Sequence, residues 1–224
     1  MNDWAVLGVS FVYVLLVVGA AEGLRRARLV SFDLSRKIIH IGIGTWILPT
    51  VLLFHSRWLA ALPPAVFVLL NLLSLRFRWT RAMDADAGSN IGTVLFPLSF
   101  VILLLGFWGA PGGRAATCSG LLALAWGDAA AALIGLRWGR HRYRAGSGWR
   151  SLEGSAAMLV FSLLAIFVSG LAVGPHPYAP LLILGGALVA SLLEATGRRG
   201  ADNLLVPLGT ALFLWGIGRL LPIG

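Results

Sequence analysis

The stretch Gly127-Asp128-Ala129-Ala130-Ala131-Ala132-Leu133-Ile134-Gly135 places one carboxylate inside an apolar segment that runs from about residue 115 to residue 136. An ionisable side chain in such a segment is costly unless it has a partner or a function. The alanines and Gly135 leave a slim helix, with room for a ligand or a neighbouring helix at the carboxylate. The stretch predicts a membrane-embedded helix in which Asp128 holds a divalent cation or makes a structural hydrogen bond.

The composition of the whole chain indicates an integral membrane protein. Its 224 residues are 58% hydrophobic and 12% charged, with a mean hydropathy of +0.86, whereas soluble proteins are about 45–50% apolar and about 25% charged. We expect residues 1–224 to form a single membrane domain whose 28 glycines allow close helix packing. The single Cys118 excludes an internal disulfide and a cysteine-rich metal site.

Apolar segments of the length needed to cross a bilayer, about 17–25 residues, recur along the chain. The sequence therefore predicts an all-α, polytopic membrane helical bundle of about eight transmembrane helices, with seven as the alternative because one segment is short. The predicted spans are Trp4–Leu24, Ile38–Phe54, Trp58–Leu75, Thr93–Gly109, Ala115–Leu136, Leu152–Leu171, Pro180–Ala195 and Leu204–Leu221.

The distribution of basic residues predicts the orientation of the bundle. Fifteen of the 18 lysines and arginines fall in alternate loops between the predicted spans. By the positive-inside rule these loops are cytoplasmic, so we expect both termini outside and a cytoplasmic site. We also expect the membrane to be a prokaryotic inner membrane. The net charge of +9 is spread over these short loops. It therefore fits anionic headgroups or phosphates, and we expect no nucleic acid binding.

The second predicted span begins with a cationic face. Arg36, His40 and Gly44 are spaced four residues apart, and Lys37 lies three residues before His40, so these side chains share one side of a helix. Lys37 is the only lysine beside seventeen arginines, which suggests a role for a compact ammonium group. The alternative is an ordinary basic flank of a membrane helix.

Other charged residues adjoin the same predicted cytoplasmic side. The segment 137–150 contains several arginines and three glycines, which predicts a flexible basic loop that surrounds a polyphosphate, or a plain cytoplasmic loop. It matches no P-loop or dinucleotide fingerprint. Glu153, like Asp202 with Asn203, is either a ligand or a favourable group at a helix N-terminus.

Four short motifs follow one another along the chain: Arg36-Lys37-x-x-His40-x-x-x-Gly44, Gly127-Asp128-x-x-Ala131-x-x-x-Gly135, Arg150-Ser151-x-Glu153-Gly154-Ser155 and Asp202-Asn203-x-x-Val206-Pro207. In this order they resemble the CTP-dependent polyprenol kinases, which include dolichol kinase and phytol kinase and are distantly related to phosphatidate cytidylyltransferase. The resemblance covers about residues 36–207. In one departure, Arg150 stands where the family commonly has lysine, which keeps the charge but replaces a compact ammonium with a planar fork.

The resemblance implies a membrane enzyme that transfers the γ-phosphoryl group of CTP to an isoprenoid alcohol such as phytol, a polyprenol or dolichol, with Mg²⁺ or another divalent cation. Its partners would be the lipid alcohol, the nucleotide and membrane lipids, and a homodimer is one option. The implied catalytic residues are Asp128, His40 and Lys37. The implied phosphate contacts are Arg36, Lys37, Arg140, Arg142, Arg150, Ser151, Gly154 and Ser155. The implied metal ligands are Asp128, Glu153, Asp202 and Asn203.

Other functions remain as alternatives. A CTP-dependent diacylglycerol kinase or a phosphatidate cytidylyltransferase-like enzyme would use the same nucleotide, although the long acidic signature of the latter is absent near the C-terminus. A proton- or ion-coupled transporter would use Asp128 and His40 as a relay within the membrane.

Overall fold

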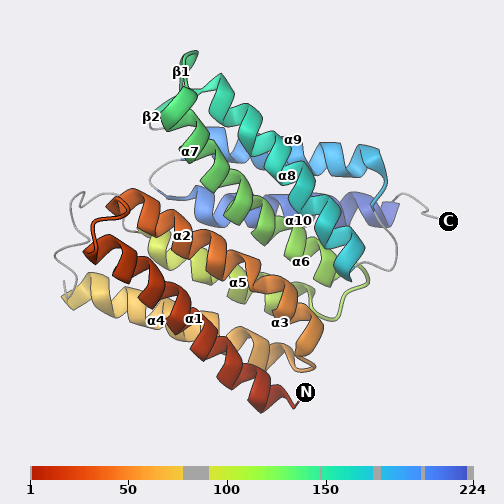
Figure 1. Cartoon of the computed structure of the whole chain (residues 1–224). Helices are drawn as coiled ribbons and strands as arrows, with labels where there is room; N and C mark the ends of the chain where they lie inside the picture. Colours follow the sequence, from red (N-terminus) through yellow and green to blue (C-terminus); the bar gives the residue numbers. More distant parts are fainter. Residues whose placement is uncertain (1, 78–90, 147, 174–177, 198–199, 221–224) are drawn as a thin grey trace.

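A computed structural model describes residues 2–77, 91–146, 148–173, 178–197 and 200–220 (Figure 1). Nearly all of the described chain is helical, apart from one short hairpin. The elements in chain order are α1 (Asp3–Arg26), α2 (Phe32–Thr45), α3 (Ile47–Leu53), α4 (Arg57–Phe77), α5 (Ile91–Phe107), α6 (Gly113–Leu122), the π-helical turn η2 (Ala123–Asp128), α7 (Ala129–Trp138), β1 (Arg142–Ala145), β2 (Gly148–Ser151), α8 (Leu152–Val173), α9 (Pro180–Thr196) and α10 (Asp202–Leu220).

Each of the eight predicted apolar segments forms a helix or a run of consecutive helices. Six of these stretches are long and apolar enough to cross a membrane, two of them as composites of shorter elements, 32–53 and 113–138. The other two, α5 and α9, are apolar helices of 17 residues each. The prediction of an all-α polytopic bundle is confirmed.

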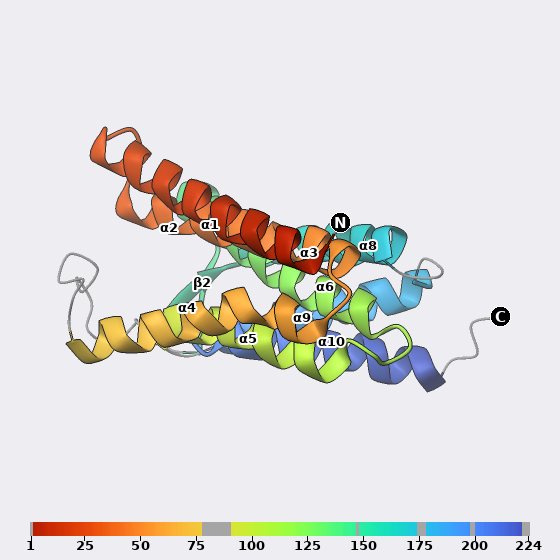
Figure 2. The same ribbon diagram turned by 90° about the horizontal axis from the view of Figure 1, so that it is seen from below.

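The helices form two groups around a central composite helix. α6, η2 and α7 follow one another along this central helix, and α8, α9 and α10 pack around it. On the other side, α1 packs on α2 and α4 packs on α5, and Figure 2 shows these two pairs as separate layers. In α6, every residue except Arg114 is buried, so the central helix that leads to Asp128 begins in the core of the bundle.

Small residues allow other helices to approach this central helix closely. A Cβ atom at Gly44 of α2 would collide with Ala125, and one at Gly127 would collide with Met158 of α8. Trp126 Nε1 also donates a hydrogen bond to Thr45 Oγ1 over 2.9 Å, which ties η2 to α2. π-Helical turns are rare in proteins, and those that occur are often at functional sites. This one ends at Asp128.

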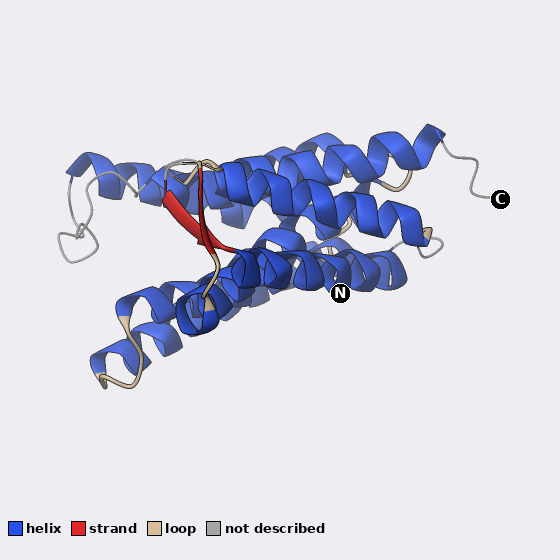
Figure 3. Ribbon diagram, turned by 90° about the horizontal axis from the view of Figure 1, so that it is seen from above, coloured by secondary structure: helices blue, strands red, loops and turns tan. Residues whose placement is uncertain are grey.

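The segment between α7 and α8 is an antiparallel hairpin instead of the predicted flexible loop. Arg142 pairs with Ser151 and Ala145 with Gly148. Gly146 has φ +57° at the turn, a conformation that favours glycine. Figure 3 shows this hairpin at one end of the bundle, and Figure 1 shows that α1 begins and α10 ends toward the opposite end.

Prolines inside α4 and α5 do not break these helices. Pro97 has no backbone N–H, so it leaves the carbonyl of Thr93, four residues earlier, without its helical partner. The side chain of Asn71 on α4 donates to that carbonyl over 2.7 Å. Asn71 of α4 thus supplies a hydrogen bond to a backbone carbonyl of α5. Backbone polar groups within a membrane need such partners because no water is there to bind them.

Candidate active site

Lys37 and Asp128 form an ion pair between α2 and the end of η2. Lys37 Nζ lies 2.5 Å from Asp128 Oδ2, although 91 positions separate them in the chain. The side chains are 25% and 16% exposed, so the pair is largely withdrawn from solvent. The contacts of Gly44 and Trp126 described above set the spacing of these two helices. The only lysine of the chain is therefore the partner that the carboxylate in the apolar helix needs.

A second ion pair joins the hairpin to α9. Arg150 Nε lies 3.1 Å from Glu194 Oε1, and Arg150 Nη2 donates to the carbonyl of Glu194 over 3.4 Å. The Glu194 side chain is only 6% exposed. This contact fixes β2 against the last turn of α9 and directs an arginine toward the interior of the bundle.

Both ion pairs line one polar pocket of about 390 Å³. Arg142 and Asp202 line it too, so three cationic and three acidic side chains surround the space. Of the residues predicted from sequence, the pocket brings together Lys37, Asp128, Arg142, Arg150, Ser151, Gly154, Ser155 and Asp202. Four motifs that are far apart in the chain thus meet at one site.

The start of α8 forms one wall of this polar pocket. Ser151 Oγ accepts a hydrogen bond from the backbone N–H of Gly154 over 3.1 Å, as a helix N-cap does. Tyr143 of β1 lies 2.6 Å from Ser155, hydroxyl to hydroxyl. Gly154 packs so closely on α7 that a Cβ atom would meet the carbonyl of Ala131. The N-terminal end of a 22-residue helix thereby faces the pocket, and such ends attract phosphate groups.

Five predicted site residues lie outside the polar pocket. Arg36, His40 and Asn203 line a neighbouring apolar cavity, whereas Glu153 and Arg140 line neither space. Glu153 points to the entry of the hairpin, where its carboxylate is 2.7 Å from His141 Nδ1, and it does not line the polar pocket. Arg140 does not line it either. Glu153 was expected beside Asp128, but the helical turn that begins α8 points its side chain outward, while Gly154 faces α7.

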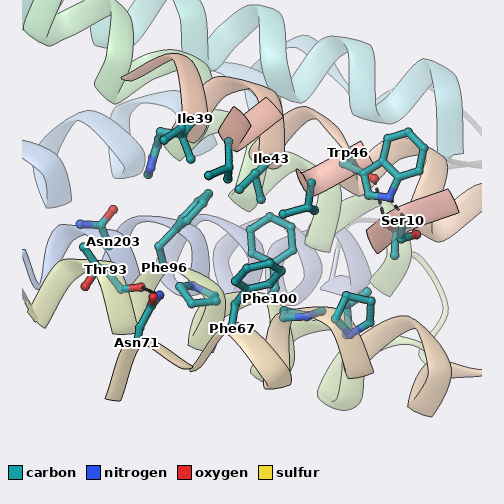
Figure 4. A pocket seen from close by; sticks show the side chains of 18 of the residues that line it. Ser10, Ile39, Ile43, Trp46, Phe67, Asn71, Thr93, Phe96, Phe100 and Asn203 are labelled. Atoms are coloured by element: carbon teal, nitrogen blue, oxygen red, sulfur yellow. Dashed lines mark hydrogen bonds between the residues drawn. The ribbon is translucent and has the colours of Figure 1, made fainter. Parts of the chain in front are cut away.

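An apolar cavity of about 330 Å³ lies next to the polar pocket, between the α1–α2 layer and the α4–α5 layer. Its lining includes Phe67, Phe96 and Phe100, which Figure 4 shows pointing into the space. The polar side chains at one end belong to several helices (Figure 4). Figure 4 shows Asn71 of α4, Thr93 of α5 and Asn203 of α10 together at this end. Arg36 and His40 of α2 also line the cavity.

His40 lies at this polar end. Its ring stacks on Phe96 with centroids 4.0 Å apart. His40 Nε2 is buried and has no hydrogen-bond partner within the described ranges of the chain. A nitrogen in this position can exchange a hydrogen bond or a proton with a molecule in the cavity.

The carboxylates of the polar pocket fit a divalent cation that shares its ligands with a phosphate. Within the described residues, no three His, Cys, Asp or Glu side chains come together as a complete metal site. Mg²⁺ is usually held by one or two carboxylates together with phosphates and waters. Asp202 Oδ1 is buried and without a hydrogen-bond partner among the described residues. Asp128 and Asp202 are therefore two side chains able to hold such an ion, while the third carboxylate of the pocket, Glu194, is paired with Arg150.

Comparison with known proteins gives one curated relative that covers almost the whole chain. This chain is 35% identical to the phytol kinase of Synechocystis sp. over 213 residues, which is 95% of this chain and 91% of the relative. The chain belongs to the polyprenol/phytol kinase-like family. No protein-family profile matches the chain, and no solved structure matches it.

The site of this family member includes residues that sequence reasoning did not select. Glu194 is a nearly buried carboxylate in an apolar helix, so the argument applied to Asp128 would have found it. Asn71 carries a similar signal, as a carboxamide among the leucines of α4. Trp149 lines the polar pocket from β2, and no sequence pattern distinguishes it from a tryptophan that anchors a helix at the membrane interface.

Proposed function

We propose that this protein is a lipid alcohol kinase that transfers the γ-phosphoryl group of CTP to the hydroxyl group of an isoprenoid alcohol at the cytoplasmic face of the membrane. Its relative, a phytol kinase, supports an alcohol acceptor and a phosphoryl-transfer reaction. The resemblance of the four motifs to CTP-dependent polyprenol kinases supports CTP as the donor.

One observation carries this proposal. At two places in the chain, neighbouring residues line different spaces. On α2, Arg36 lines the apolar cavity and Lys37 lines the polar pocket. At the start of α10, Asn203 lines the apolar cavity and Asp202 lines the polar pocket. A polar space for a nucleotide therefore touches an apolar space for a lipid tail along α2 and the start of α10. A phosphotransferase with a water-soluble donor and a membrane-soluble acceptor needs such a boundary.

The residues at the boundary have separate roles in the proposed reaction. The alcohol oxygen attacks the γ-phosphorus, the bond from that phosphorus to the β,γ-bridging oxygen breaks, and CDP leaves. His40 accepts the hydroxyl proton. Lys37 and Arg150 neutralise charge on the phosphates, and the first N–H groups of α8 bind phosphate oxygens. Catalysis of this kind consists mainly of positioning and charge stabilisation.

The charges of the pocket support a role for a divalent cation. Three cationic side chains face three acidic ones, so the pocket alone offers a polyphosphate little net attraction. Mg²⁺ would supply the missing positive charge and would be held by Asp128 and Asp202. The Lys37–Asp128 pair keeps the Asp128 carboxylate in place before the nucleotide binds.

The proposal is tested with protein purified in lipid nanodiscs, Mg²⁺ and CTP labelled separately at the α and γ phosphates. Phytol, geranylgeraniol, dolichol, dioleoylglycerol and phosphatidate are the candidate acceptors. We expect label from the γ position in an isoprenoid monophosphate, and no lipid labelled from the α position. ATP, GTP and UTP in place of CTP establish the donor preference.

The other outcomes contradict the proposal in different ways. Label from the α position in a CDP-lipid would make the protein a cytidylyltransferase. γ-Label in phosphatidate formed from dioleoylglycerol alone would make it a diacylglycerol kinase. Absence of transfer, together with ion flux in sealed vesicles, would indicate a transporter.

A further inference from the structure

The apolar cavity lies beside the residues that are proposed to react. On its polar side lie His40, Asn71 and Asn203. Farther along the cavity, Trp46 Nε1 donates to Ser10 Oγ over 3.0 Å (Figure 4), and Thr50 of α3 lines the space beyond Trp46. From His40 to Thr50 the helical rise of 1.5 Å per residue gives a length of about 15 Å.

The cavity volume sets how much of a lipid it can hold. At about 30 Å³ per water molecule, a space of about 330 Å³ takes roughly eleven groups of that size. Methylene and methyl groups are of similar size, so the cavity accommodates about two five-carbon isoprene units of one chain. The same volume cannot hold ten-carbon stretches of two chains at once.

The cavity also reaches the lipid-facing surface. Val18 of α1 and Phe67 of α4 line it, and both are partly exposed. The remainder of a long tail can therefore continue into the bilayer between these two helices. An apolar tail gains little free energy on moving from lipid into an apolar protein cavity, because both surroundings lack water. The cavity acts through shape: it fixes the position of the hydroxyl group.

We propose that this cavity is the site for the hydroxyl-proximal two isoprene units of a single-chain alcohol, and that its shape excludes diacylglycerols. This inference rests on the proposed function. The hydroxyl group lies at the polar end formed by His40, Asn71 and Asn203, one helical turn from Lys37 on α2. Asn71 is held there by its hydrogen bond to the carbonyl of Thr93. The first two isoprene units extend toward Trp46.

A binding experiment without nucleotide tests the site independently of phosphoryl transfer. A geranylgeraniol analogue with a diazirine in its second isoprene unit is irradiated with the protein in nanodiscs, and the labelled residues are mapped by mass spectrometry. We expect labels in α2, α4 and α5 and competition by unlabelled geranylgeraniol but not by dioleoylglycerol. Labels confined to the outer surfaces of α8 and α9, or equal competition by dioleoylglycerol, would overturn the inference.

A matched pair of variants tests the shape of the cavity. Val14 is 5% exposed and lines the cavity, whereas Val12 is 57% exposed on the same helix. Val14→Phe should raise the KM for geranylgeraniol at least tenfold, leave the KM for CTP unchanged and affect the five-carbon alcohol prenol far less. Val12→Phe should change none of these values, and melting temperatures report whether each variant folds.

The outcomes separate this inference from the proposed function. Photolabelling inside the cavity without any transfer from CTP would support the tail site and contradict the proposed reaction. Transfer from CTP to dioleoylglycerol as fast as to geranylgeraniol would overturn the tail site and leave phosphoryl transfer in place. An equal effect of Val14→Phe on prenol and geranylgeraniol would also contradict the tail site.

Discussion

At the scale of single residues, the carboxylate at Asp128 could be predicted as important, whereas its partner could not be assigned. A charged group inside an apolar helix needs compensation, and Lys37 was already distinguished as the only lysine. Their 2.5 Å contact depends on how α2 lies against η2, which local sequence does not encode. For Glu153, the motif predicted a role as a metal ligand together with Asp128. In the structure its side chain contacts His141 instead.

Asp128→Asn should remove activity without unfolding the protein. Asparagine keeps the size of the side chain but loses the charge that would bind a cation and pair with Lys37. We expect kcat to fall on the order of 10²-fold or more, as for other groups that stabilise charge in a transition state. The measurement is the initial rate of label transfer from CTP, with melting temperature as the check on folding.

Asp33→Asn is the matched control for that variant. Asp33 is an exposed acidic residue in the first turn of α2, on the same helix as Lys37 but outside both cavities. Its rate should stay within about twofold of the parent rate, as expected for a surface substitution. A rate for Asp128→Asn equal to that of Asp33→Asn would contradict the catalytic role of Asp128.

Arg150 carries the one departure from the family motif, and Arg150→Lys restores the usual residue. Lysine keeps the positive charge toward Glu194, so we expect near-parental activity. Arg150→Ala instead leaves the nearly buried Glu194 without its partner, which should cost about 1–3 kcal/mol of stability and most of the activity. Thermal unfolding and initial rates of the two variants check both expectations. Loss of all activity in Arg150→Lys would show that the guanidinium fork itself is required.

At the scale of elements, the lengths of the apolar segments predicted where the helices lie, but not where the helices break or change geometry. Apolar runs fixed where the spans lie, because a bilayer demands a minimum length. The break between α2 and α3 at Trp46 and the π-helical turn before Asp128 depend on packing between helices. The hairpin was missed because each strand has only four residues and because β2, Gly148-Trp149-Arg150-Ser151, lacks the alternation of apolar and polar residues that marks a strand.

Gly44→Ala tests the close contact that brings α2 to the central helix. The added Cβ atom would collide with Ala125, push α2 away from η2 and separate Lys37 from Asp128. We expect a loss of about 1–3 kcal/mol in stability, typical of overpacking, and a larger relative loss of activity. Thermal unfolding in detergent and initial rates provide the two measurements.

Gly8→Ala is the matched substitution in α1. No atom lies within 4 Å of a Cβ built at this glycine, so the change should be neutral or stabilise the helix by roughly 0.5 kcal/mol. The pair separates a packing effect from a general effect of replacing glycine. If both variants behaved alike, the close contact at Gly44 would not be what positions the site.

At the scale of the whole molecule, the bundle places its functional groups at one end. The polar pocket adjoins the hairpin, whereas α1 begins and α10 ends toward the other end (Figures 1 and 2). The distribution of basic residues predicts that the hairpin end is cytoplasmic. A cytoplasmic site would have direct access to nucleotides, while the acceptor reaches it through the membrane.

Cysteine labelling tests this orientation. The native Cys118 is fully buried and is replaced by alanine, and single cysteines are then introduced as Arg144→Cys on the hairpin or His55→Cys before α4. Both positions are exposed and lie outside both cavities. In intact bacterial spheroplasts, a membrane-impermeant maleimide should label the His55→Cys protein but not the Arg144→Cys protein, and permeabilisation should make Arg144→Cys reactive. The reverse pattern would place the hairpin and the polar pocket outside the cell, where CTP is not supplied, and would contradict the proposed kinase along with the predicted topology.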